Sequence, residues 1–134
     1  MEIFMLNLKL KDGSALDIPA ESILMVEENP EGKKLTNIVY SLEAGQNLFD
    51  TLDAAYGYVK KQWREQNPHL GNLLEVNLAG DKPHKMIFAD TMVIARRELK
   101  DDPSGANTRL TLNVNGKVVG IQVTDNRDSL AGEA

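Results

Sequence analysis

The chain has 134 residues with no cysteine and a formal net charge of −5. Its 42% hydrophobic and 26% charged residues are ordinary for one soluble globular domain. The absence of cysteine excludes a disulfide framework, a thiolate metal site and a cysteine nucleophile. The acidic balance argues against a strong polyphosphate-binding face, which needs clustered Lys and Arg. No signal peptide or membrane span is expected, and the expected location is the cytoplasm of the producing or host cell.

The first expected element is a β-hairpin. Residues 4–10 alternate apolar and polar side chains, which is typical of a strand with one buried face. Asp12 and Gly13 form a turn signal, with a positive φ expected at Gly13 or a neighbour. A three-residue loop is preferred because it keeps the apolar faces together and sets Leu10 opposite Leu16.

Two further strands are expected before the middle of the chain. The apolar run 23–26 lacks alternation, which favours a strand covered on both faces, with a short helix as the alternative. Residues 29–32 read Asn-Pro-Glu-Gly and predict a turn. The β-branched and aromatic segment 36–42 predicts the next strand.

Segment 47–66 carries the only long helical period in the chain. Its expected N-cap is Asn47 or Asp50, and Pro68 is expected to stop the helix. The spacing of the apolar residues predicts one buried stripe. That stripe consists of Phe49, Leu52, Tyr56, Val59 and Trp63.

The rest of the chain again reads as strands. The clearest feature is a hairpin whose two-residue loop is Asn115-Gly116, which sets Leu112 against Val119. The polar tail 125–134 is expected to fray. The expected strands cover 74–78, 86–88, 92–94 and both arms of the hairpin 109–123.

The two strand-rich flanks match each other in order, which predicts an internal duplication. In this alignment Ala20 corresponds to Ala89 and Gly32 to Gly105. The alternative is that any two β-rich segments share turn residues and apolar runs. The matched segments are 18–25 with 87–94, 29–32 with 102–105, and 36–40 with 108–112.

The expected fold is therefore α+β and mostly antiparallel, in a single domain spanning 1–134. Its repeat halves cover about 4–42 and 73–123, packed around a pseudo-twofold with the helix between them. The second half is expected to add a last strand that the first half lacks.

The first third of the chain resembles the small flagellar β-domain proteins of the FlbD type. A looser resemblance is to LytTR-type β modules that bind DNA. The FlbD resemblance implies a small β-rich unit, and it rests on a strand followed by a Gly turn and on apolar, acidic and proline positions in matching spacing. Those positions are Gly13, Ile18, Ile23, Val26, Glu27 and Pro30.

One basic cluster is a candidate contact for a partner or for nucleic acid: Lys60, Lys61 and Arg64 lie together on the expected helix. A solvated helix face is the competing interpretation. Arg96 and Arg97 lie elsewhere in the sequence.

The candidate chemical groups are sparse. His69 and His84 each follow a proline and are expected to be solvated loop residues, since no third ligand stands at metal spacing. The acidic pairs 27–28 and 101–102 could bracket a cation or act as paired carboxylates, although solubilising turn residues are the simpler interpretation. No catalytic residue, metal site or cofactor is assigned.

These observations favour a non-enzymatic protein-interaction or assembly module, such as a small accessory protein of a phage or bacterium. Its partner would be another protein, or a second copy bound through sheet edges. One alternative is a nucleic-acid-associated regulator that uses the basic helix face. The other is a small metal-dependent hydrolase that uses the acidic turns.

Overall fold

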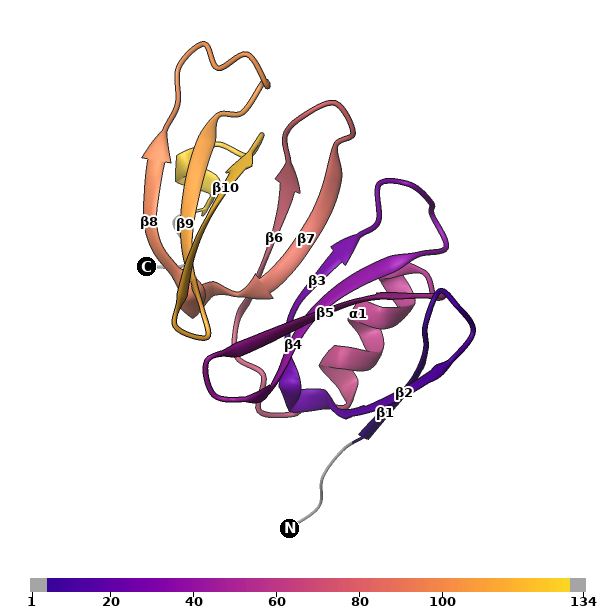
Figure 1. Ribbon diagram of the computed structural model, residues 1–134. Coiled ribbons are helices and arrows are strands. Elements are labelled where there is room, and N and C mark those ends of the chain that lie inside the picture. Colours follow the sequence, from indigo (N-terminus) through magenta and orange to yellow (C-terminus); the bar gives the residue numbers. More distant parts are fainter. Residues whose placement is uncertain (1–4, 131–134) are drawn as a thin grey trace.

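The computed structural model describes residues 5–130, and it is mostly antiparallel β with one α-helix, as expected (Figure 1). Eight strands form one sheet in the order β5-β4-β3-β7-β6-β10-β9-β8, and β1 and β2 form a separate hairpin. The strands are β1 Met5–Lys9, β2 Ala15–Pro19, β3 Ile23–Glu28, β4 Thr36–Glu43, β5 Gln46–Leu52, β6 Leu73–Leu78, β7 His84–Ala89, β8 Val93–Glu98, β9 Thr108–Val114 and β10 Lys117–Val123. The helices are α1 Tyr56–Glu65 and the 3₁₀ turns η1 Ala20–Ser22, η2 Asp90–Met92 and η3 Arg127–Leu130.

The same order of elements occurs twice along the chain. The first half, residues 5–66, runs through a hairpin, a 3₁₀ turn, three strands and α1. The second half, residues 73–130, runs through a hairpin, a 3₁₀ turn, three strands and η3. The last strand of the second half therefore has a counterpart, because β5 holds the place that β10 holds. The expectation that this strand would be an addition was wrong.

Several local contacts also recur at matching places. The buried Thr36 hydroxyl donates to the Ala54 carbonyl at 2.6 Å, and the buried Thr108 hydroxyl donates to the Asp125 carbonyl at 2.8 Å. Each hydroxyl belongs to the first residue of a strand and bonds the segment that follows the next strand. In each half a single antiparallel pair also links the first-strand region to the last strand. Leu10, the residue after β1, pairs with Leu52 of β5, and Leu78 of β6 pairs with Val123 of β10.

The halves join through one pairing, which we call the inner junction: β3 runs antiparallel to β7. Within the halves, β3 is the third strand of the first and β7 is the second strand of the second. A twofold axis would require the reverse pairing as well, between β2 and β8. Among the described strands, β2 pairs only with β1 and β8 only with β9, so the halves meet head to tail and not about the expected pseudo-twofold.

Two apolar cores lie on opposite faces of the inner junction. The first holds the buried residues of the first half, including Val59 and Trp63 of α1, together with Ile87 of β7. The second holds the buried residues of the second half together with Met25 of β3. Each half thus places a side chain in the core of the other, as expected for successive strand residues that point to opposite faces.

The helix is shorter than the sequence predicts, because 46–52 is strand β5. Gly45 takes a φ of +78° in the tight connection, and Phe49 then pairs with Val39 of β4. Phe49 is 60% exposed, so its expected place in the buried stripe was wrong, whereas Tyr56, Val59 and Trp63 are buried. Leu52 is also buried, but from the strand.

The first hairpin has the expected faces but a different register. Leu8 lies opposite Leu16, two positions away from the preferred register. The pair Lys9–Ala15 closes a turn longer than expected, in which the backbone N–H of Leu10 donates to the Ser14 carbonyl and Leu10 pairs with Leu52 of β5. Gly13 takes the expected positive φ.

The second hairpin matches its prediction fully. Asn115 and Gly116 both have positive φ, and Leu112 lies opposite Val119. The predicted strand start at residue 4 and the tail residues 131–134 lie outside the described part of the chain.

The residue alignment of the halves also needs one correction. Ala20 is the first residue of η1, whereas Ala89 is the last residue of β7, so they are not equivalent. The turns do align: the backbone N–H of Gly32 donates to the Asn29 carbonyl, and that of Gly105 donates to the Asp102 carbonyl.

Candidate functional site

The predicted basic cluster lines a groove of about 770 Å³ between α1 and the strands β6 and β7. The groove is not uniformly basic, because acidic and apolar side chains share its walls. Its lining residues are Lys60, Lys61, Arg64, Glu65, Asn72, Leu73, Leu74, Glu75, Ile87 and Asp90.

Each basic residue of the cluster already has an intramolecular partner. Lys60 Nζ lies 2.9 Å from Glu75 Oε2, and Arg64 donates to the Gly71 carbonyl at 2.9 Å. Lys61 lies 3.9 Å from Glu65, one helical turn away. The structure therefore brings the three predicted residues together. Lys60 and Lys61 each face a carboxylate, whereas Arg64 bonds a neutral carbonyl.

One carboxylate organises the wall of this groove. Glu75 accepts the Tyr56 hydroxyl at 2.7 Å in addition to Lys60, whose Nζ lies 5.1 Å from the Tyr56 ring centroid. Burial by itself raises the pKa of Glu75, but the hydrogen bonds from Lys60 and Tyr56 lower it by more. Burial and the Glu75 carboxylate both raise the pKa of Tyr56. At neutral pH this arrangement is a charged Glu–Lys pair beside a protonated tyrosine, which ties α1 to β6.

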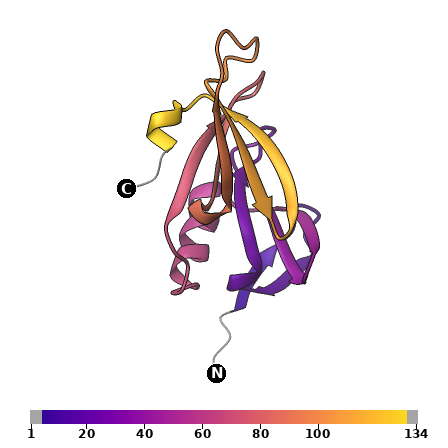
Figure 2. The ribbon, with the colours of Figure 1, turned by 90° about the vertical axis from the view of Figure 1, so that its left-hand side faces the viewer.

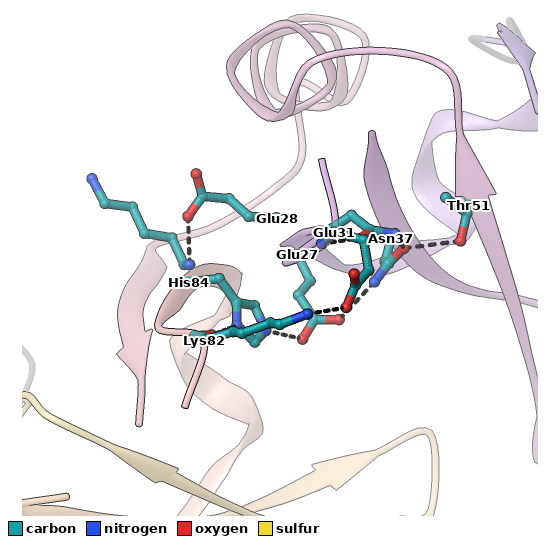
Figure 3. Close-up of polar contacts among 9 residues, drawn as sticks. Glu27, Glu28, Glu31, Asn37, Thr51, Lys82 and His84 are labelled. Carbon is teal, nitrogen blue, oxygen red and sulfur yellow. Dashed lines mark hydrogen bonds and ion pairs between the residues drawn. The ribbon is translucent and has the colours of Figure 1, made fainter. Parts of the chain in front are cut away.

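A second polar cluster closes one end of the inner junction (Figure 3). His84 Nε2 lies 2.7 Å from Glu27 Oε2, and Nδ1 lies 2.8 Å from the Lys82 carbonyl. The side-chain N–H of Asn37 donates to the other Glu27 oxygen. The Asn37 side-chain oxygen accepts the Thr51 hydroxyl at 2.9 Å. The network thus runs from β7 across β3 and β4 to β5.

Two more contacts extend this cluster. Glu28 accepts the backbone N–H of Lys85 at 2.6 Å, and Lys82 lies 2.7 Å from Glu31. The expectation that His84 is a solvated loop residue was therefore wrong. It is the first residue of β7, its side chain is only 17% exposed, and it bonds across the junction, whereas His69 is exposed.

The acidic pairs differ between the halves. Glu27 and Glu28 bond across the junction, while Asp102 accepts the backbone N–H and the hydroxyl of Ser104 within its own turn. The hydrogen bonds from Ser104 lower the pKa of Asp102. Within residues 5–130 no three His, Cys, Asp or Glu side chains are grouped as a metal site would require.

The third candidate surface is the free side of β8, which we call the β8 edge (residues 93–98). It lies at one end of the eight-stranded sheet, with β5 at the other end, and every residue after Val93 in it is exposed. Ile94 is 57% exposed, and Arg96 and Arg97 lie on the same strand. Figure 2 views the molecule from the side on which this strand lies.

Sequence reasoning missed the His84–Glu27 pair and the β8 edge. Both depend on which strands of the two halves pair with each other, and no local sequence pattern predicts that pairing. The repeated element order was the available signal, because joining two such units once leaves strands with an open side, β8 and β2 among them.

Among the described residues, no helix is long and apolar enough to cross a membrane. Comparison with protein-family models, with curated proteins and with solved structures finds no match to this chain.

Proposed function

We propose that this chain is a non-enzymatic protein-interaction or assembly module that presents the β8 edge to a protein partner. One observation carries the proposal: a six-residue strand ends the sheet with an exposed Ile94 and exposed neighbours on both sides of Arg96. An unpaired strand edge offers N–H and C=O groups in a row, which is the template for adding a strand from another chain.

We further propose that the two halves arose by duplication. The repeated order of elements, the two buried threonine contacts and the two matched turns support this origin. Two β units joined head to tail use one edge each, so one edge of each unit stays open. The duplication thus accounts for the free edge as a feature of the architecture.

The alternative of a nucleic-acid-associated regulator has less support. Lys60, Lys61 and Arg64 are paired within the chain, and Glu65, Glu75 and Asp90 lie beside them. A phosphate backbone would have to compete with Glu75 and Glu65 for Lys60 and Lys61.

The test is affinity capture from extracts of the native host with two matched variants. Ile94→Lys places a charge on the edge, a substitution that blocks strand addition. Val118→Lys makes the same change at a valine of β10 that is 70% exposed. β9 lies between β10 and β8, so this variant leaves the β8 edge unchanged.

We expect the parent and Val118→Lys to retain the same bound proteins and Ile94→Lys to lose them. Equal capture by all three chains would contradict the proposal. Bound material that disappears after nuclease treatment would favour the nucleic-acid alternative.

A further inference from the structure

The inner junction provides a template for a second contact. In it Met25 lies opposite Phe88, Val26 opposite Ile87 and Glu27 opposite Met86. The junction joins the third strand of one unit to the second strand of the next unit.

Both strands of this template have unpaired counterparts. β8 corresponds to β3: each follows a 3₁₀ turn, each pairs with the next strand, and the register shifts at Leu24 in β3 and at Ile94 in β8. β2 corresponds to β7, because each is the second strand of the hairpin that begins its half. Leu16 lies opposite Leu8 in the first hairpin, and Met86 lies opposite Val76 in the second. Among the described strands, neither β2 nor β8 has a partner on its outer side.

We propose that β8 of one copy pairs with β2 of a second copy in the register of the inner junction; this inference rests on the proposed function and names its partner. The corresponding pairs are Ala95 with Ile18, Arg96 with Asp17, and Arg97 with Leu16.

Charge supports this choice of partner. Arg96 and Asp17 are both exposed, and the template sets them directly opposite each other. They take the places of Val26 and Ile87, which are buried in the inner junction. Opposite charges at facing positions stabilise an antiparallel pair. The same places therefore hold an apolar pair inside the chain and a complementary ion pair between chains.

Two neighbouring positions fit the same contact. Leu24 packs against the core of the adjoining half, and its counterpart Ile94 is 57% exposed with no adjoining half to cover it. Glu28 accepts the backbone N–H of Lys85 across the inner junction, and its counterpart Glu98 would face the backbone of Ala15 of the second copy. Pro19 ends β2, so the contact is limited to a few residues and is expected to be reversible.

The two surfaces lie at opposite ends of the molecule, with β8 at one side of Figure 1 and the β1–β2 hairpin at the other. A contact between different surfaces leaves one of each free after every addition. The product is therefore a ring or a filament and not a closed twofold dimer.

The test is self-association measured by analytical ultracentrifugation over micromolar to millimolar concentrations. The variants are Arg96→Asp and Asp17→Arg, each alone, then mixed, then combined in one chain. Lys34→Asp and Asp81→Arg are controls with the same charge changes at exposed loop positions.

We expect the parent and both controls to associate with rising concentration. Each single variant faces like charges across the contact, and its self-association weakens about tenfold or more, as a change of about 1.4 kcal/mol implies. In an equimolar mixture, each variant chain again meets an opposite charge on the other variant, so association returns. The double variant restores opposite charges in the same way, with the two signs exchanged. A circular dichroism melt shows that every variant folds.

A parent that stays monomeric at millimolar concentration, or single variants that associate like the parent, would overturn the inference. The proposed function is judged separately by capture from host extracts. Asp17→Arg leaves β8 open, so a foreign protein would stay bound to it while Ile94→Lys loses that protein. If both variants capture the same host proteins as the parent, and the parent stays monomeric, the inference and the proposed function are both wrong.

Discussion

At the scale of single residues, the His84–Glu27 contact makes one link between the halves depend on pH. Burial by itself lowers the pKa of His84, but its hydrogen bonds to the Lys82 carbonyl and to Glu27 raise it above its ordinary value of 6.5. A raised folded-state pKa means that the folded chain binds the proton more tightly than the unfolded chain. The resulting stability is fully present below the ordinary pKa of histidine and is lost as pH rises through the folded-state value.

Glu27→Gln removes the charge and keeps the shape. We expect the pKa of His84 to fall, and the stability advantage of the parent over this variant to be larger at mildly acidic than at alkaline pH. Histidine NMR titration and denaturant unfolding at both pH values measure these effects. Glu21→Gln, an exposed position in η1, is the control. An unmoved His84 titration in Glu27→Gln would show that the contact does not set the proton affinity.

The sequence could not have identified this pair. Glu27 and His84 lie far apart in the sequence, and the residues around each of them predict only a turn. What joins them is the pairing of β3 with β7, a choice made between whole strands. By contrast, Tyr56, Val59 and Trp63 were predicted as buried because a helix repeats its buried face within a few residues.

At the scale of elements, the turns were more predictable than the strand–helix boundary. The Asn115-Gly116 pair predicts its own backbone angles, because few other residue pairs accept two positive φ values. The boundary between β5 and α1 gave no such signal. Phe49, Leu52 and Tyr56 have a helical spacing, but Leu52 also faces the core from a strand, and pairing with β4 decided the outcome.

Gly116 and Gly57 test two different effects of glycine on stability, its access to positive φ and its low helix propensity. Gly116 has a φ of +88°, so Gly116→Ala should cost roughly 1–2 kcal/mol of unfolding free energy. Gly57 lies in α1 with open space where a Cβ would stand, so Gly57→Ala should gain up to about 1 kcal/mol. Denaturant unfolding of both variants beside the parent measures the two signs. A loss of stability in Gly57→Ala would mean that this helix position needs glycine for another reason.

At the scale of the whole molecule, the two cores share a wall. β3 gives Val26 to the first core and Met25 to the second, while β7 gives Ile87 to the first and Phe88 to the second. Strands this deeply shared cannot leave one half without exposing apolar surface of the other. The fold class and part of the repeated order were visible in the sequence, whereas strand β5 was not. The head-to-tail joining was not visible either, because a twofold joining would bury the same kinds of residues.

Leu110→Ala tests whether the shared wall makes the molecule one unfolding unit. Leu110 is fully buried in the second core, so its truncation should cost roughly 2–5 kcal/mol. Trp63, the only tryptophan in the sequence, lies buried in the first core and reports that core by fluorescence. If the halves unfold together, the Trp63 midpoint in denaturant falls as far as the midpoint of far-ultraviolet circular dichroism. A Trp63 midpoint that stays at the parent value while the circular dichroism transition splits would show that the first half folds independently of the second.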